Sequence, residues 1–295
     1  MNLVMTLLVR DEIDLVENNI NFHLERGIDG VVVIDNGSTD GTREILEDMS
    51  KSAPITVMHE PGRDYDQTRW VTRAALYARD TMGAEWVLNN DADEFWVSKD
   101  GSLKDVISYA QANNLLLCPR RNMIWGYDSP EDRPWYERLN ARIDRPIQRP
   151  TLQNIYDSPL PCPYFYLDLP PKALVRTEGL VEIAQGNHDA LFDTPVSAVE
   201  APIDIFHFPV RSRNQFEKKV VQGGQAYEKN TRFPEGVGWH WRRWYQLYRN
   251  KGIDAALADA LPSAAALAAD LQDGVAIEDK SFASSVERTC NWVDK

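Results

Sequence analysis

Three short polar runs contain the residue types that could carry chemistry, and each follows an apolar run. They lie at 10–12 (RDE), 35–41 (DNGSTDG) and 91–94 (DADE). The three carboxylates of the last run repel one another, and a bound cation relieves such repulsion. Because side chains two positions apart in extended backbone point the same way, we expect Asp91 and Asp93 to share one hard divalent ion. That ion would keep ligand positions open for phosphate oxygens. A solvated acidic loop is the less favoured alternative.

An alternation of strand and helix patterns positions these runs. Apolar and β-branched stretches predict strands at 2–9, 31–35, 55–59, 85–90 and 115–118. Three- and four-residue spacing of apolar residues predicts helices at 11–26, 42–49, 66–82 and 103–112. Such alternation builds a mostly parallel α/β sheet with flanking helices. Ligands gather at the carboxyl ends of its strands, so the three runs should meet at one edge.

The rest of the chain predicts a second half and a helical extension. The stretch 127–172 is rich in proline and aromatic residues and has little periodicity, which is typical of loops that cover a site. Strands are expected at 173–176 and 203–208, and helices at 215–230, 239–250 and 253–271. We therefore divide the chain into 1–125, 126–230 and a C-terminal helical extension at 231–295.

Composition excludes several classes of protein. Lys and Arg number 32 against 45 Asp and Glu, a net charge of −13, which argues against a general nucleic-acid binder. No apolar run approaches the ~18–20 residues of a membrane helix, and the N-terminus lacks the features of a signal peptide. Cys118, Cys162 and Cys290 fit neither a disulfide framework nor a zinc site. A soluble, cytoplasmic protein is expected, with peripheral membrane association left open.

One basic segment stands out in this acidic chain. Residues 207–251 hold ten Lys and Arg against three Asp and Glu, a local charge of +7. The segment is either a solvated helix face or an anion site, because Lys and Arg are the usual partners of phosphate. The residues alone do not choose between the two.

Several of these motifs together resemble glycosyltransferase family 2. The resemblance rests on the runs 10–12, 35–42 (DNGSTDGT) and 86–95 (WVLNNDADEF), with Asn19 and His23. It is greatest for the branch whose strand-four motif ends in DADEF. The runs 186–188 (GNH) and 207–212 (HFPVRS), with Phe216 and Lys219, resemble that branch's C-terminal pattern. The likeness covers about residues 1–230.

The resemblance implies a GT-A fold and a metal-dependent transferase that moves a hexosyl or related sugar from a nucleotide-sugar donor to an acceptor hydroxyl. The donor would be a UDP- or GDP-sugar, the ion Mn²⁺ or Mg²⁺, and the acceptor a glycan, polysaccharide or glycolipid precursor. Residues 1–125 would bind the nucleotide sugar and 126–230 would face the acceptor. A sugar-nucleotide or glycan-binding relative without turnover is the alternative, and metal-dependent release of nucleoside diphosphate would exclude it.

The resemblance also assigns donor and metal residues. Asp35 would bind the base, in a pocket lined by backbone near Leu8 and Arg10. Asp91 and Asp93 would form the Asp-x-Asp pair, with Asp93 the stronger metal ligand and Asp91 nearer the ribose. His207 would complete the metal shell, with His188 as the alternative. Arg211 and Lys219 are candidates for the pyrophosphate, against an exposed helix face as the alternative.

The acceptor base is less clear. The Glu-Asp pair that usually opens a helix after the acceptor loop is not recognisable, so inverting and retaining chemistry both stay open. Asp189, with His188 beside it, and Glu182 are the candidate bases, and Asp168 is a weaker one. Tryptophans 125, 135, 239, 241 and 244 could stack on an acceptor sugar, but core packing is the favoured interpretation.

Four other classes fit less well. Residues 36–47 nearly match a calcium loop, but a strand precedes them and position one is Asn. An aspartyl-phosphate phosphatase would place its acidic motif after the first strand, whereas this one follows the fourth. A dinucleotide enzyme would show G-x-G-x-x-G, and a nucleotidyltransferase a Gly-rich loop, where LLVRDE stands.

Overall fold

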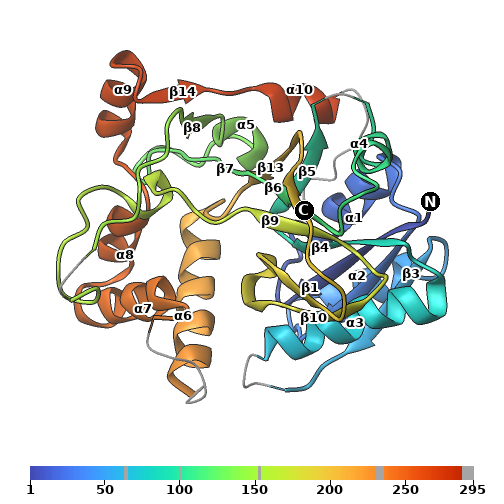
Figure 1. Cartoon of the computed structure of the whole chain (residues 1–295). Coiled ribbons are helices and arrows are strands. Elements are labelled where there is room, and N and C mark those ends of the chain that lie inside the picture. The colour runs from blue at the N-terminus through green and yellow to red at the C-terminus, as the bar shows by residue number, and fades with distance from the viewer. Residues whose placement is uncertain (63–65, 100, 152–153, 230–235, 288–295) are drawn as a thin grey trace.

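A seven-stranded sheet forms the centre of the computed structural model, which describes residues 1–62, 66–99, 101–151, 154–229 and 236–287 (Figure 1). Its order is β12-β6-β9-β4-β1-β2-β3. The strands are β1 (Leu3–Val9), β2 (Gly30–Asp35), β3 (Ile55–His59), β4 (Trp86–Asp91), β6 (Leu115–Cys118), β9 (Lys172–Arg176) and β12 (Ala198–Glu200). The pairs β1–β2, β1–β4, β2–β3 and β6–β12 are parallel, and only β9 runs antiparallel to its neighbours β4 and β6. The predicted mostly parallel α/β fold is confirmed.

Helices cover both faces of this sheet because side chains alternate along each strand. Leu3 and Met5 of β1 face a core shared with α1 (Val16–Glu25), α2 (Thr42–Met49) and α4 (Leu103–Tyr109). Val4, between them, faces the opposite core with α3 (Gln67–Met82). The helix predicted at 11–26 begins only at Val16, because residues 12–15 form a turn instead.

Smaller sheets accompany the central one among the described residues. β5 (Glu94–Ser98) and β7 (Arg120–Asn122) flank β13 (Ile203–His207), and β13 runs antiparallel to β5 and parallel to β7. β10 (Leu180–Ile183) pairs with β11 (Ala190–Phe192), and β8 (Ala141–Ile143) pairs with β14 (Ala276–Glu278). The stretch 127–172 also holds α5 (Trp135–Arg138) and a single turn at Tyr164–Tyr166. These pairings bring residues far apart in the chain next to the DADE run.

Five helices follow β13: α6 (Arg213–Lys229), α7 (Trp239–Lys251), α8 (Ile253–Ala260), α9 (Ala264–Gln272) and α10 (Ser281–Glu287). The prediction of one helix over 253–271 is wrong. Pro262 interrupts it, since a proline cannot continue the hydrogen-bond ladder and forces Leu261 into extended backbone. Ser263 then caps α9 by accepting the amide of Ala266. Asn230 and Cys290 lie outside the described residues, and none of the helices in the described ranges has the length and apolar character to span a membrane.

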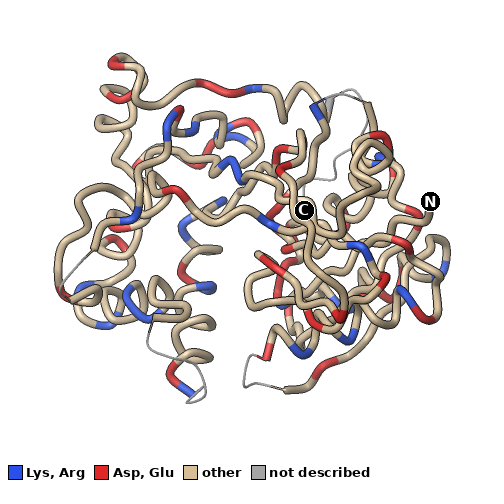
Figure 2. The backbone as a smooth tube through the Cα atoms, viewed as in Figure 1, with Lys and Arg blue, Asp and Glu red and all other residues tan. Residues whose placement is uncertain are grey.

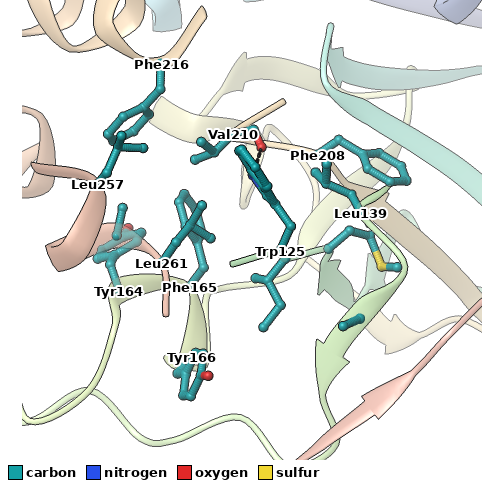
Figure 3. Close-up of a cluster of buried hydrophobic side chains, with 14 of the residues drawn as sticks. Trp125, Leu139, Tyr164, Phe165, Tyr166, Phe208, Val210, Phe216, Leu257 and Leu261 are labelled. Carbon is teal, nitrogen blue, oxygen red and sulfur yellow. Dashed lines mark hydrogen bonds between the residues drawn. The ribbon is translucent and has the colours of Figure 1, made fainter. Parts of the chain in front are cut away.

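A large aromatic core lies beneath the C-terminal half (Figure 3). Trp125, Trp239 and Trp244 are buried in it, and the indole of Trp125 donates to the carbonyl of Val210 at 2.9 Å. Trp135 and Trp241 pack against the same cluster and are partly buried. Core packing of these five tryptophans is therefore confirmed.

Candidate active site

The three polar runs meet at the carboxyl edge of the central sheet. In the sheet register Val9 lies beside Asp35, and Leu8 lies between Ile34 and Asp91. The strands β1, β2 and β4 therefore end side by side, as predicted. Asp11, directly after β1, has a φ of 55°, a backbone conformation that non-glycine residues adopt at a cost. Its carboxylate accepts the amide of Thr39 at 2.7 Å, which joins the first run to the second.

Asp35 ends β2 with its side chain fully buried. Its carboxylate accepts the amide of Ser38 at 3.0 Å and both Nε and Nη2 of Arg43, at 2.8 and 2.7 Å. Burial raises the pKa of Asp35, but the bonds from Ser38 and Arg43 outweigh burial, so the pKa lies below its usual range. Asp35 is therefore an ionised acceptor at the end of β2, and the half-exposed Arg43 is its resident partner.

The DADE run is a tight turn between β4 and β5, and α1 holds its shape. The Asn19 amide nitrogen donates to the carbonyls of Ala92 and Glu94, at 2.9 and 2.8 Å. Its oxygen accepts from Asn90 at 2.9 Å. One helical turn later, the imidazole of His23 accepts the backbone amide of Trp96 at 3.2 Å. Asn19 and His23, four residues apart on one helix face, are thus the supports of the acidic turn.

Because Ala92 and Asp93 form a turn, the two aspartates of the motif do not point the same way, as extended backbone would require. Asp91 accepts the ammonium of Lys172 and, at 3.3 Å, the amide of Asn187. Asp93 instead accepts the ammonium of Lys219 at 2.8 Å. The expectation that the two carboxylates point the same way is corrected, because they contact different lysines. An ion shared by both stays a prediction.

Lys219 of α6 lies between two carboxylates, Asp93 Oδ2 and Glu12 Oε1, each 2.8 Å from its Nζ. Burial and the two carboxylates act in opposite directions on the lysine, and the carboxylates win, so its pKa is raised. Burial raises the pKa of Asp93, yet Lys219 and the other cations outweigh it and the pKa falls. Burial dominates at Glu12 and its pKa is raised. One ammonium thus bridges two carboxylates that follow β1 and β4, and Arg211 supplies a second positive charge at Glu12.

Lys172 and Glu94 form a second buried pair behind the turn. Glu94 is fully buried, and neither carboxylate oxygen has a hydrogen-bond partner among the described residues. Its nearest charges are Lys172 at 3.4 Å and Arg120 at 3.6 Å, too far for strong hydrogen bonds. Burial raises the pKa of Glu94 to about 7. Asn187, which also holds Asp91, has a φ of 60° and an unpartnered buried oxygen among the described residues.

His207 ends β13 opposite Glu94 in the register and faces Asp93. Its Nε2 lies 3.8 Å from Asp93 Oδ1, while its Nδ1 donates to the oxygen of Asn122 at 2.8 Å. That bond leaves Nε2 unprotonated, and burial lowers the pKa of His207 to about 3. The lone pair of His207 Nε2 therefore faces the Asp93 carboxylate at 3.8 Å, with no proton between the two atoms.

The Asp93–His207 pair fits part of a metal shell. One carboxylate oxygen and one imidazole nitrogen, the latter oriented by Asn122, match the way proteins bind divalent ions with help from substrate phosphates. The described residues contain no group of three or more His, Cys, Asp or Glu that could hold an ion. Asp91 is engaged by Lys172 instead. The fit is thus to two protein ligands and not to three.

Arg211 does not lie open to a ligand. Its buried guanidinium binds Asp14 through Nε and Nη2, at 2.7 and 3.0 Å, and Glu12 through Nη2 at 2.7 Å. Its Nη1 donates to the carbonyl of Phe208 at 3.3 Å. Arg211 therefore has a structural role: it joins the loop after β1, through Glu12 and Asp14, to the loop after β13. The predicted contact with pyrophosphate is not supported by this geometry.

The remaining predicted residues lie at different distances from the cluster. Arg10 follows β1, and its Nε is buried without a partner among the described residues. His188 donates from Nδ1 to the carbonyl of Pro171 at 2.8 Å, and burial lowers its pKa to about 3. Asp189, the next residue, is exposed. Glu182 is exposed on β10 opposite Leu191, and Asp168 accepts the Gln148 amide at 2.9 Å. Neither Glu182 nor Asp168 makes a described contact with the carboxylate cluster, which consists of Glu12, Asp35, Asp91, Asp93 and Glu94.

Sequence reasoning missed four residues of the cluster. Glu12 and Asn187 stood inside motifs that had been noted, so their motifs were a usable signal. Arg43 is two residues past the glycine that ends the DNGSTDG run. Lys172 gave no signal, because only the antiparallel pairing of β9 with β4 brings it to Asp91.

A mostly parallel sheet with helices on both faces carries carboxylates and their cations at the ends of three adjacent strands, which is an α/β fold of the GT-A type. Glycosyl transferase family 2 matches residues 12–160, which is half of the chain, and the chain belongs to that family.

Comparison with solved structures finds TarS of S. aureus. The structure of TarS 1–349 has 13% identity and a TM-score of 0.39, covering 85% of this chain and 73% of that one. A second TarS structure has 14% identity and a TM-score of 0.41, covering 85% of this chain and 44% of that one. A third, TarS 1–349 in complex with UDP-GlcNAc, has 14% identity and a TM-score of 0.39, again covering 85% and 73%. No curated protein matches the sequence.

Proposed function

We propose that this protein transfers a hexosyl or related sugar from a nucleoside-diphosphate sugar to an acceptor hydroxyl, with Mn²⁺ or Mg²⁺ as cofactor. The observation that carries the proposal is the pair of Asp93 and the unprotonated Nε2 of His207, 3.8 Å apart, at the carboxyl edge of a family 2 chain. The ionised Asp35 ends β2 at the same edge, with β1 between it and β4. Both features suit a donor with a base at one end and a diphosphate at the other.

Each residue of the edge has a task in this proposal. Asp35 would accept hydrogen bonds from the base, displacing the half-exposed Arg43. Asp93 and His207 would hold the ion, and when bound it would offset the charge that develops on the leaving diphosphate. Lys219, one-fifth exposed beside Asp93, would donate to the same phosphates. Asp91, held by Lys172 and Asn187, would face the ribose.

The acceptor base belongs to the proposal as well. Asp189 is exposed two residues after Asn187, which contacts Asp91, and it is our first candidate. His188 is the second, because its Nδ1 proton is engaged by Pro171 and its Nε2 is free of a proton. Glu182 is the third and is the least favoured, since it lies exposed on β10. The acceptor would be a glycan, polysaccharide or glycolipid precursor.

A thermal-shift panel tests the donor and the metal together. The protein is melted with UDP-, GDP-, CMP- and dTDP-sugars, each with and without Mn²⁺. A ligand at a hundredfold excess over its Kd stabilises the native state by about 2.7 kcal/mol. A shift for UDP- or GDP-sugars that requires Mn²⁺ is expected. No shift with any donor would contradict the proposal.

Release of nucleoside diphosphate separates a transferase from a binding relative. The donor that shifts the melting temperature is incubated with the protein and Mn²⁺, and free UDP or GDP is measured. We expect slow metal-dependent release even without acceptor, because water can take the place of the hydroxyl. Donor binding without any release, with or without added glycans, would favour the non-catalytic alternative.

A further inference from the structure

A groove of about 430 Å³ lies where the end of α6, the length of α7 and the segment near Tyr156 come together. Its size falls within the ~300–1,000 Å³ of ordinary ligand sites. Six of its lining residues matter here: Tyr156, Arg242, Tyr245, Gln246, Arg249 and Asn250. Aromatic rings, guanidinium groups and amides therefore face one space, and none of them belongs to the carboxylate cluster.

One wall of the groove is aromatic and held in place. The ring of Tyr245 stacks on Tyr248 with centroids 6.4 Å apart and 16° between planes. It also packs directly on the bare backbone of Gly224, where a Cβ would come within 2.2 Å of the ring. The C–H face of a sugar is apolar and packs well on such a ring, while amides such as Gln246 and Asn250 can bond its hydroxyls.

The other wall is basic. Arg242 stacks over Tyr227 at 5.6 Å, and its Nε is buried with no hydrogen-bond partner among the described residues. Because Arg242 lines the groove, its planar guanidinium can pair with a carboxylate or phosphate bound there. Arg249 lies over Tyr245 at 5.6 Å, and its partner Glu228, at 3.1 Å, is an exposed one that contributes little.

The basic segment 207–251 supplies the cations of this groove. Four of its cations are engaged by carboxylates away from the groove: Arg211, Arg213, Lys219 and Arg243. The carboxylate that pairs with Arg249, Glu228, lines the groove itself. Arg242 and Arg249 of α7 face the groove instead, in a chain whose net charge is −13. Figure 2 shows the basic positions gathered along α7. Cations of this segment thus lie at two places of interest: Lys219 beside Asp93 at the carboxyl edge of the sheet, and Arg242 and Arg249 at the groove.

α6 connects those two places. Lys219 contacts Asp93 near the start of the helix, and Glu228 lines the groove nine residues later, about 13 Å along the axis. Tyr227 links them further, because Arg242 stacks on its ring and the Gln185 side chain bonds its hydroxyl. A ligand in the groove would therefore lie away from the transferred sugar but on the same helix.

We propose that this groove binds an acidic sugar unit of an extended acceptor glycan, with the sugar ring on Tyr245 and its carboxylate or phosphate on Arg242. That this glycan is the acceptor rests on the proposed function, whereas the binding of an acidic sugar in the groove does not. Contacts to a part of the substrate remote from the reacting atoms supply binding energy that can be used at the reacting centre. Specificity would then depend on the anion, since a neutral glycan leaves Arg242 unpaired.

Calorimetric titration of the full chain without donor tests the groove. The probes are hexagalacturonate, a mannohexaose phosphorylated at O6, and neutral maltohexaose of the same length. We expect the acidic hexamers to bind at least about tenfold more tightly than maltohexaose, and the tighter of the two identifies the anion. Equal binding of the neutral hexamer, or no binding of either acidic one, would overturn the proposal.

Variants assign the binding to named residues. Arg242→Ala should weaken the acidic hexamer at least about tenfold, and Arg242→Lys should restore only part of the loss because it lacks the planar fork. Glu228→Gln should strengthen binding severalfold, since it removes a carboxylate that competes for Arg249. Arg145→Ala, whose side chain is 94% exposed on another segment, is the matched control and should change nothing.

Different results would contradict the binding proposed for the groove and the proposed transferase activity. Thermal midpoints confirm that each variant is folded, and Arg242→Lys keeps the test informative if the alanine variant is not. An unchanged affinity in a folded Arg242→Ala protein would overturn the groove. A wild-type protein that binds hexagalacturonate but neither binds nor cleaves a nucleotide sugar would instead leave the groove in place and remove the transferase.

Discussion

Asp93 and Glu12 share one ammonium group, and that sharing decides what a substitution at Asp93 does to the fold. Lys219 lies 2.8 Å from each carboxylate, so removing the charge of Asp93 leaves the lysine paired with Glu12. Repulsion between the two carboxylates disappears at the same time. Activity and stability should therefore respond very differently to a change at this position.

Asp93→Asn is expected to lower turnover by about 100-fold or more, because it removes a ligand and a charge next to the developing diphosphate. The free energy of unfolding should change by less than about 1 kcal/mol, since Glu12 keeps Lys219 paired. Initial rates of nucleotide release and urea unfolding measure the two. Asp204→Asn, which loses ion pairs with Arg121 and Lys99 away from the edge, is the control and should keep its turnover. Wild-type turnover in Asp93→Asn would mean that the metal is held elsewhere.

Burial of His23 makes the stability of the protein depend on pH, in addition to what the buried His207 contributes. Burial lowers the pKa of His23 to about 4, Arg26 adds to the effect, and both ring nitrogens are engaged, by the Asn19 carbonyl and the Trp96 amide. The folded pKa lies below the unfolded value of about 6.5, so the unfolded state binds the proton more readily. Stability is full above pH 6.5 and falls as the pH drops toward 4.

Between pH 7.5 and 4.5 this histidine should account for roughly 2–3 kcal/mol of lost stability. In His23→Gln the pH-dependent part of the loss should shrink by that amount, although the variant starts from a lower stability at pH 7.5. Urea unfolding at the two pH values measures it. His59→Gln, with a half-exposed ring, should keep the wild-type dependence. The same slope in His23→Gln would show that His23 is not buried in its neutral form.

Residue types alone identified the aspartates of the edge but could not separate Arg211 from Lys219. Both cations lie in one basic segment, eight residues apart, and both were predicted at the pyrophosphate. The structure gives Arg211 to Asp14 and Glu12, which are 197 and 199 residues away in the chain. Contacts at such separations depend on the finished fold, and no local pattern encodes them.

At the scale of elements, α1 holds the acidic turn in shape, and Asn19 makes most of the bonds. The Asn19 amide donates to carbonyls on both sides of Asp93 and accepts from Asn90, so three bonds fix the turn between β4 and β5. An aspartate at this position would keep the size of the side chain but set a carboxylate against two carbonyl oxygens. The turn would then move, and Asp93 would move with it.

Asn19→Asp should therefore cost about 2–4 kcal/mol of stability, because two carbonyls lose their donor and a charge is buried. Turnover should fall by about 100-fold, since displacement of a positioned group by ~1 Å has that effect. Asn18→Asp, one position earlier on α1 and half-buried, is the matched control. Both are compared by urea unfolding and by donor hydrolysis. A stable and active Asn19→Asp protein would exclude α1 as the support of the turn.

Element types were predictable wherever the local pattern was strong. The buried strands at 31–35 and 55–59 and the helix at 66–82 follow from β-branched runs and helical spacing, and the structure has them nearly unchanged. The direction of β9 was not predictable, because pairing with β4 and β6 is set by contacts across the sheet. Its consequence is large, since that pairing brings Lys172 to Asp91.

At the scale of the whole molecule, the chain returns at its C-terminal end to the region where the site is built. Phe282 of α10 packs on Phe95, which directly follows the DADE run, with ring centroids 5.0 Å apart, and on Phe208 at 4.7 Å. β14 pairs with β8 on the way. One hydrophobic cluster thus includes residues from 1–125, from 126–230 and from the C-terminal extension. The helices after residue 230 therefore act as part of the packing behind the acidic turn.

Phe282→Ala tests that role, because the side chain is only 2% exposed and is surrounded by aromatic rings. The cavity should cost about 3–5 kcal/mol of stability. Turnover should fall as well, since Phe95 loses the ring that fixes it beside Glu94. Leu271→Ala is the control, at a side chain that is 39% exposed in the same extension. It should change the free energy of unfolding by no more than about 0.5 kcal/mol and leave turnover unchanged. Urea unfolding and donor hydrolysis measure both. A folded Phe282→Ala protein with wild-type stability would show that the extension is a separate unit, whose return across the core does not support the site.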